Sequence, residues 1–187
     1  MFGNISDKGI KAEKLFEQHL NNENIPFYRI DQNKDTQSIE FKNKNIHRPD
    51  YRIRTKNNIF YIDVKYRGKE HFGDNHEERF IIEPYYIDSL IKFQEEFHQD
   101  VWLAFTSSLN SPQFCYTTAS LIYEHYKNIE KIYEEKKFQK FTKLFIYIPN
   151  SLLLFNCLSF EKGFYKDQDV EYLETEVDYL KRIAKYR

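Results

Sequence analysis

Asp50, Asp63 and Lys65 are the residues of this 187-residue sequence whose types and spacing best fit a catalytic role. Two carboxylates supply the hard oxygen ligands that Mg²⁺ prefers, and a neighbouring amine can orient or deprotonate a water molecule. The three residues lie within "PDYRIRTKNNIFYIDVK", positions 49–65, where apolar and charged residues alternate. This alternation predicts a β-hairpin with one apolar face and one polar face. All three side chains then project from the polar face.

A two-residue turn at Asn57 and Asn58 sets the expected register of the hairpin, because asparagine tolerates the positive φ angles of such turns. The paired residues are then Tyr51 with Val64, Ile53 with Ile62, Asp50 with Lys65, and Arg52 with Asp63. The alternative interpretation is an ordinary hairpin whose outer face carries charge pairs that other residues could replace. Each such pair stabilises the fold by only about 0.2 to 1 kcal/mol.

The upstream elements bring a further carboxylate toward this hairpin. A helix is expected over residues 8–20, with Ile10, Phe16 and Leu20 on one side and Glu13 beside that apolar stripe. Residues 25–30 read as a strand, and residues 31–45 as a loop or an irregular hairpin arm.

The segments after the hairpin are expected to form a loop, a helix and a strand. Residues 68–79 are expected to form a polar loop, followed by a helix that begins near Pro84 and a buried strand over 101–106. The order up to this strand is α, β, β, β, α, β. The remainder predicts a helix over 118–136, a hairpin made from "LFIYI" and "LLLFN", and a C-terminal helix over 170–184. We therefore expect a single domain over 1–187, with a core of about 1–106 and an α/β extension of about 107–187.

This pattern resembles the PD-(D/E)XK nuclease superfamily. The match consists of "PD" at Pro49 and Asp50, "DVK" at positions 63–65, a helical Glu13, and the order of elements over roughly the first 106 residues. The resemblance implies an α/β fold with a restriction-endonuclease-like αβββαβ core, in which a mixed central sheet is flanked by helices. It also implies a Mg²⁺-dependent enzyme that hydrolyses phosphodiester bonds of DNA, with Mn²⁺ as a possible substitute.

The resemblance assigns roles to individual residues. Asp50 and Asp63 would bind the metal, together with the backbone carbonyl of Val64, and Glu13 would bind it through water or help to hold a second ion. Lys65 would assist the attacking water. Gln94 and Lys92 lie on the following helix, where some branches of the superfamily place residues that contact the substrate.

Charge is unevenly distributed along the chain. The sequence has 28 basic and 29 acidic residues, a net charge of −1, which argues against coating nucleic acid by charge alone. Residues 42–69 nevertheless contain nine basic and two acidic residues, a net charge of +7, and the two acids are Asp50 and Asp63. We expect the basic residues flanking the site to contact phosphates: Arg48, Arg52, Arg54, Arg67 and Lys69. Arg52 and Arg54 have an alternative role, which is to balance the carboxylates.

Other functions stay open at this point. A catalytically inactive module that binds nucleic acid or protein, or a nuclease that acts on RNA, would fit the same residues. The sequence has neither a signal-peptide pattern nor an apolar run that could span a bilayer, so a cytoplasmic location without membrane partners is expected. DNA is the expected partner, with a homodimer or a separate specificity subunit as further possibilities.

Overall fold

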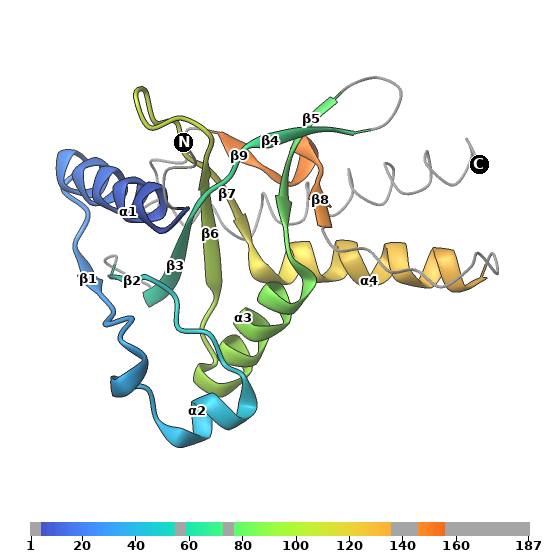
Figure 1. Cartoon of the computed structure of the whole chain (residues 1–187), viewed down its shortest axis with the longest axis horizontal. Coiled ribbons are helices and arrows are strands. Elements are labelled where there is room, and N and C mark those ends of the chain that lie inside the picture. Colours follow the sequence, from blue (N-terminus) through green and yellow to red (C-terminus); the bar gives the residue numbers. More distant parts are fainter. Residues whose placement is uncertain (1–4, 55–58, 73–76, 136–145, 156–187) are drawn as a thin grey trace.

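The computed structural model describes residues 5–54, 59–72, 77–135 and 146–155. Six of the strands form the principal sheet, in the spatial order β1-β2-β3-β6-β7-β9 (Figure 1). Their bounds are β1 Phe27–Arg29, β2 Tyr51–Arg54, β3 Ile59–Tyr66, β6 Val101–Thr106, β7 Cys115–Thr118 and β9 Leu154–Phe155. β3 and β6 are parallel, whereas the other neighbouring pairs are antiparallel. The expected mixed central sheet is confirmed, and strands from both the core and the C-terminal region build it.

β3 is an interior strand because it pairs with β2 on one side and β6 on the other. Its sequence, "IFYIDVKY", is apolar enough for a strand with neighbours on both edges. Asp63 lies opposite Leu103 of β6, and Lys65 lies opposite Phe105. Two charged residues therefore lie in the middle of the sheet.

The register of β2 and β3 differs from the expected one by two residues. Tyr51 pairs with Ile62 and Arg54 with Ile59, so four residues, 55–58, separate the strands. The register expected from a two-residue turn at Asn57 and Asn58 was therefore wrong, and residues 55–58 themselves lie outside the described residues. A shift of two residues leaves each side chain on its expected face, since strand side chains alternate with a period of two.

The expected charge pairs across this hairpin were also wrong. Arg52 lies opposite Tyr61 instead of Asp63. Continued by one residue, the same register sets Asp50 beside Asp63 instead of Lys65. The structure thus brings two carboxylates together where the sequence predicted an ion pair.

Helices cover both faces of the principal sheet. α1 (Ile5–Asn22) packs on one face through Ala12, Phe16 and Leu20, which are fully buried with Trp102 and Ala104 of β6. Ile10, expected in the same stripe, is 47% exposed, because the buried stripe lies to one side of it.

α3 (Pro84–Phe97) and α4 (Ala119–Glu135) lie on the opposite face (Figure 1). There Ile87, Leu90 and Phe93 of α3 and Ile122 of α4 pack with alternate residues of β6 such as Leu103. The strand over 101–106 and the helices expected near Pro84 and over 118–136 are confirmed.

A second, three-stranded sheet has the order β4-β5-β8. Its strands are β4 Lys69–Phe72, β5 Glu77–Ile82 and β8 Ile146–Ile148, and a short 3₁₀ helix, η2 (Asn150–Leu152), follows. Residues 68–79 are therefore not simply a polar loop. The hairpin expected from "LFIYI" and "LLLFN" was also wrong, because β8 pairs with β5 while β9 pairs with β7.

A short helical segment replaces much of the loop expected over 31–45. It contains a 3₁₀ helix, η1 (Lys34–Thr36), and α2 (Ile39–Lys44). The Ser38 hydroxyl accepts a hydrogen bond from the backbone N–H of Phe41 at 3.2 Å, which caps the start of α2. Asn45 ends the helix at φ 54°, a left-handed conformation that asparagine tolerates. This segment leads the chain into His47 and Asp50.

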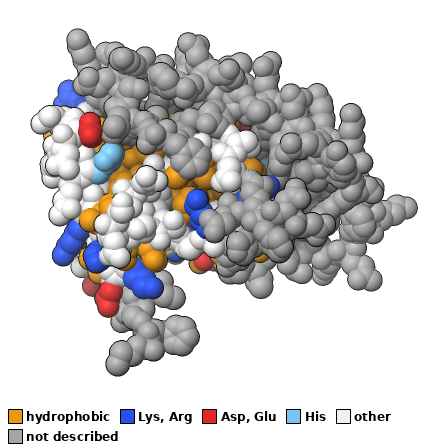
Figure 2. Space-filling view, turned by 90° about the horizontal axis from the view of Figure 1, so that it is seen from above, with side chains coloured by type: hydrophobic (Ala, Val, Ile, Leu, Met, Phe, Trp, Pro, Cys, Tyr) orange, Lys and Arg blue, Asp and Glu red, His pale blue; other side chains and the backbone are white. Residues whose placement is uncertain are grey.

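Figure 2 views the molecule from the top of Figure 1, and the apolar side chains described on that face form a band with Lys and Arg side chains at its margins.

Within the described ranges, no helix is long and apolar enough to cross a bilayer. The helix expected over 170–184 lies outside the described residues.

Gln94 ties α3 to two neighbouring elements instead of facing the candidate site. Its amide N–H donates to Ser120 Oγ at 2.8 Å, and its carbonyl accepts from the backbone N–H of Val101 at 3.2 Å. Val101 is fully buried, so its N–H would lose its partner in Gln94→Ala. We expect this variant to lose about 1 to 3 kcal/mol of unfolding free energy, measured by urea denaturation.

Glu95→Ala, at the exposed neighbouring position, is the control and should leave stability nearly unchanged. Unchanged stability of Gln94→Ala together with weaker nucleic-acid binding would instead give Gln94 a substrate-contacting role.

Candidate active site

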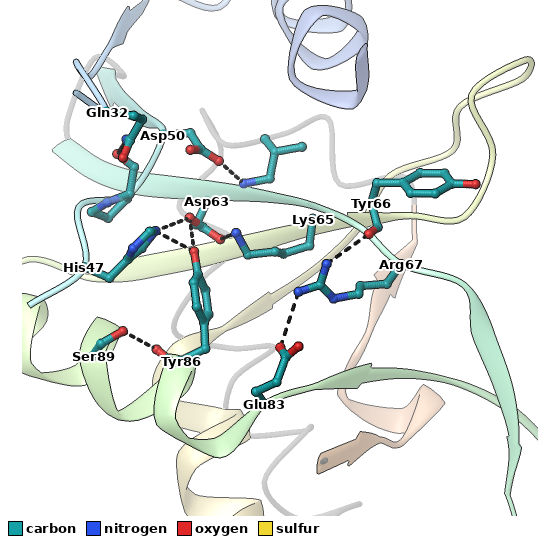
Figure 3. Close-up of polar contacts among 12 residues, drawn as sticks. Gln32, His47, Asp50, Asp63, Lys65, Tyr66, Arg67, Glu83, Tyr86 and Ser89 are labelled. Carbon is teal, nitrogen blue, oxygen red and sulfur yellow. Dashed lines mark hydrogen bonds and ion pairs between the residues drawn. The ribbon is translucent and has the colours of Figure 1, made fainter. Parts of the chain in front are cut away.

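Asp63 is the centre of a buried polar cluster on the α3 side of β3 (Figure 3). Its side chain is fully buried, and Lys65 Nζ lies 2.7 Å from its Oδ2. The Tyr86 hydroxyl, from the first turn of α3, donates a hydrogen bond to Oδ1 at 2.7 Å. His47 Nε2 lies 3.3 Å from the same oxygen. Both carboxylate oxygens are therefore held in place by neighbouring side chains.

Asp50 approaches the cluster from the segment just before β2. It is 8% exposed, and its Oδ2 accepts a hydrogen bond from the backbone N–H of Val64 at 2.7 Å. Its own carbonyl accepts from the Ile30 N–H at 2.8 Å, which fixes the backbone beside β1. Pro49, directly before it, accepts a hydrogen bond from the Gln32 amide at 2.9 Å. Asp50 is thus held by its backbone as well as by its side chain.

The two carboxyls have opposite electrostatic environments. Burial, together with the negative charge of Asp63, raises the pKa of Asp50 to about 8. Burial also acts to raise the pKa of Asp63, but the charge of Lys65 and the contacts with His47 outweigh it and hold that pKa below its usual value. At neutral pH the site therefore favours one charged and one protonated carboxyl.

Lys65 is confined between Asp63 and α3. Its side chain is only 14% exposed, and its ammonium lies 4.2 Å from the centre of the Tyr86 ring. The cation–π contact and the ion pair together hold the ammonium between Asp63 and the Tyr86 ring.

Glu13 reaches the neighbourhood of the cluster from α1, on the other side of the sheet. Burial raises the pKa of its carboxyl, while Arg29 and Lys65 act to lower it, so Glu13 lies within electrostatic reach of Lys65. Its direct partner is Arg29, whose Nη2 lies 2.6 Å from Glu13 Oε2. The structure therefore brings Asp50, Asp63 and Lys65 together and leaves Glu13 in an ion pair beside them.

The predicted basic residues lie around the cluster with different partners. Arg52 and Arg54 are exposed on β2, and by alternation they share the sheet face of Asp63. Arg48 donates to Asn33 O at 2.7 Å and to Thr36 Oγ1 at 3.2 Å, so it braces the turn before α2.

Beyond β3, Arg67 Nη2 lies 3.3 Å from Glu83 Oε2, and Lys69 Nζ lies 5.4 Å from the centre of the Phe80 ring. Of the five predicted cations, Arg52, Arg54 and Lys69 are exposed, whereas Arg48 and Arg67 are partly buried and hold partners inside the protein.

His47 and Tyr86 contact Asp63 and were not found from the sequence. Neither has a motif spacing that would select it, because the contact depends on how α3 packs on β3. Since the single Tyr86 hydroxyl proton is donated to Asp63, the 2.6 Å contact between Tyr86 Oη and His47 Nε2 requires the hydrogen to come from His47 Nε2. The Nε2 atom of His47 therefore carries a hydrogen.

The donor set fits a hard divalent cation. Two carboxyls converge on one buried site, and burial, followed by the negative charge of Asp63, raises the pKa of Asp50. Mg²⁺ commonly binds through one or two carboxylates and keeps several water ligands. Among the described residues no group of three or more His, Cys, Asp or Glu side chains forms a metal-binding cluster. A site here would therefore consist of Asp50, Asp63, a backbone carbonyl such as that of Val64, and water.

Opposite stability effects are expected when the two aspartates are made neutral. The pKa of Asp50 is higher in the folded than in the unfolded protein, so its contribution to stability is lost as pH rises from about 4 to about 8. The folded pKa of Asp63 is lowered, so its contribution is present above about pH 4 and is lost in more acidic solution. In EDTA at pH 8, Asp50→Asn should stabilise the protein and Asp63→Asn should destabilise it, each on the order of 1 to 3 kcal/mol.

Urea denaturation of both variants from pH 4.5 to pH 9 tests this expectation. Asp100→Asn, at an exposed position, is the matched control. Two variants with the same sign of effect at pH 8 would contradict the electrostatic difference between the aspartates.

Comparison with known proteins finds similarity among solved structures. No protein-family model matches the chain, and no curated protein matches it. The chain is similar to the structure of Hjc, a Holliday junction resolvase from the archaeal hyperthermophile Archaeoglobus fulgidus. The TM-score is 0.48 and the identity 12%, over 80% of this chain and 92% of the resolvase. The residues of the site, rather than this likeness, carry the functional proposal.

Proposed function

We propose that this protein is a metal-dependent nuclease of the PD-(D/E)XK type that hydrolyses phosphodiester bonds of DNA. One observation carries the proposal: Lys65 forms an ion pair with the fully buried Asp63, and Asp50 joins them through the Val64 N–H. An ordinary hairpin would carry its charges on an exposed face, where they cost little. Charges buried in an interior strand are expensive to desolvate, which favours a functional reason for their presence.

The carboxyls of Asp50 and Asp63 would hold Mg²⁺, or Mn²⁺ in its place, together with the carbonyl of Val64. Glu13 would act through a water ligand, or at a second ion, after exchanging its contact with Arg29. The metal would supply Lewis acidity and a counter-charge for the phosphate. The protein keeps Asp63 fixed through Tyr86 and His47, so the site is arranged before the substrate binds.

Lys65 would orient the attacking water and offset charge on the phosphate. Its ammonium is held 2.7 Å from Asp63, and burial restricts the side chain to few conformations. An ammonium paired with a carboxylate is charged, which suits electrostatic stabilisation of the developing negative charge.

DNA would approach over the exposed cations of β2. Arg52 and Arg54 lie on the Asp63 face and next to it along the sheet, and Lys69 is exposed at the start of β4, whereas Arg48 and Arg67 border the site with partners inside the protein. A phosphate that binds Arg52 or Arg54 would place the neighbouring backbone close to Asp63 and Lys65.

Cleavage should require the metal and both central side chains. The protein would be incubated with plasmid, linear and branched DNA, and with RNA, in Mg²⁺, Mn²⁺ or EDTA. Asp63→Ala and Lys65→Ala should each lower the cleavage rate by at least about 100-fold, because each removes a group that acts on the reacting atoms. EDTA should abolish cleavage by the wild type.

Asp100→Asn and Lys11→Ala change exposed residues of the same types and serve as controls. Cleavage that survives both Asp63→Ala and Lys65→Ala would contradict the proposal. Metal-dependent binding without cleavage of any substrate would favour an inactive binding module, and cleavage of RNA alone would replace DNA as the substrate.

Binding should weaken when the exposed arginines are removed. If Arg52 and Arg54 each neutralise one phosphate, the double alanine variant should lower the slope of log affinity against log salt by about 1 to 2. Fluorescence anisotropy with a labelled duplex in EDTA measures this slope. Lys44→Ala is the control, because the Lys44 ammonium already lies 2.7 Å from Glu40 and 3.1 Å from Glu96. An unchanged slope in the double variant would mean that DNA does not follow β2.

A further inference from the structure

A pocket of about 350 Å³ adjoins the candidate active site and has no role in the chemistry described above. It lies between α2, the segment 45–48 and the first turns of α3. Ligand sites in proteins typically have volumes of about 300 to 1,000 Å³, so this pocket is large enough for a small organic ligand.

The pocket shares two of its walls with the active site. His47 and Tyr86 line it, and the same two side chains contact Asp63 Oδ1. Figure 3 shows both of them pointing toward Asp63, with Ser89 one turn further along α3. A ligand in the pocket would therefore be separated from a proposed metal ligand by the thickness of one side chain.

The lining favours an anion that carries a planar polar group. It includes the cations Lys42 and Arg48, and no aspartate or glutamate is among the described lining residues. Amide side chains also line the pocket. The Gln37 amide N–H donates to Ile46 O at 2.8 Å, and its carbonyl oxygen is an acceptor of the kind that base edges pair with.

Aromatic side chains supply surfaces on which a base can stack. Tyr85 lines the pocket and is 65% exposed, although it follows Pro84 at the start of a well-packed helix. A tyrosine that is this exposed beside a polar cavity buries little of its own ring in the protein. Bases of every type stack on such rings.

We propose that this pocket binds one unpaired nucleotide of the substrate strand, next to the phosphate that is cleaved. The base would stack against Tyr85. The phosphate would be attracted by Lys42, which is exposed, and by the charge of Arg48, whose guanidinium also donates to Asn33 and Thr36. The inference rests on the proposed function and narrows its substrate class to DNA with an unpaired nucleotide near the cut site. A base in a continuous duplex is stacked between its neighbours and cannot enter a side pocket without leaving the helix.

Binding without cleavage tests the pocket separately from the reaction. The first probe is dAMP, titrated in EDTA and followed by NMR, with inorganic phosphate as a parallel probe. The second is a set of duplexes, fully paired or with a single 2-aminopurine bulge at successive positions, whose affinity and fluorescence are measured in EDTA.

We expect dAMP to shift resonances of the pocket residues, and at least one bulged duplex to bind more tightly than the paired duplex, with its fluorescence quenched. Tyr85→Ala should reduce this preference by about 5- to 100-fold, the range that loss of one base–aromatic stack implies. Tyr28→Ala, which removes a tyrosine that is 60% exposed on β1, should keep the preference.

Three outcomes would overturn the inference. Equal binding of all bulged and paired duplexes would remove the preference, and a preference that survives Tyr85→Ala would place the recognition elsewhere. Identical shifts with phosphate alone would show an anion site without base recognition. Failure of the nuclease reaction is a separate result, because none of these measurements requires cleavage.

Discussion

The burial of Asp63 in the interior strand β3 is the constraint on which the rest of the site depends. A charged carboxyl in the middle of a sheet is stable only if neighbouring groups satisfy it, and here Lys65, Tyr86 and His47 do so. Lys65 comes from the same strand, two residues later, whereas the other two come from segments that must pack against the α3 side of the sheet. The position of α3 is therefore tied to the position of the charge.

The burial of Asp50 beside Asp63 lowers the stability of the folded protein when no metal is bound. The Asp50 carboxyl is buried close to that of Asp63, and burial together with the negative charge of Asp63 raises its pKa to about 8. A bound divalent cation would relieve the repulsion, and binding to the native state alone would stabilise the protein. Unfavourable electrostatics of this kind are common at functional sites. Such sites are arranged to bind a ligand, even where this lowers the stability of the fold.

Much of the local structure could be predicted from the sequence because it follows from periodicity. The strand over 101–106 and the helices α3 and α4 were found from apolar spacing alone. The face of each side chain in β2 and β3 was also predicted correctly, since a register error of two residues preserves the alternation. Errors concentrated where pairing joins distant segments: β8 and β9 are close in the chain, but they pair with strands of different sheets.

By itself the sequence determined which residues could do chemistry, because the types and spacing in "PD" and "DVK" place two carboxyls and an amine on adjacent strands. Tertiary structure alone decided which groups contact them. The register puts Asp50 beside Asp63 instead of opposite Lys65, and the docking of α3 brings Tyr86 and His47 to Asp63. These contacts join residues 13 to 23 positions apart, and no local pattern encodes such a contact, because it results from how helices and strands pack around the buried charge.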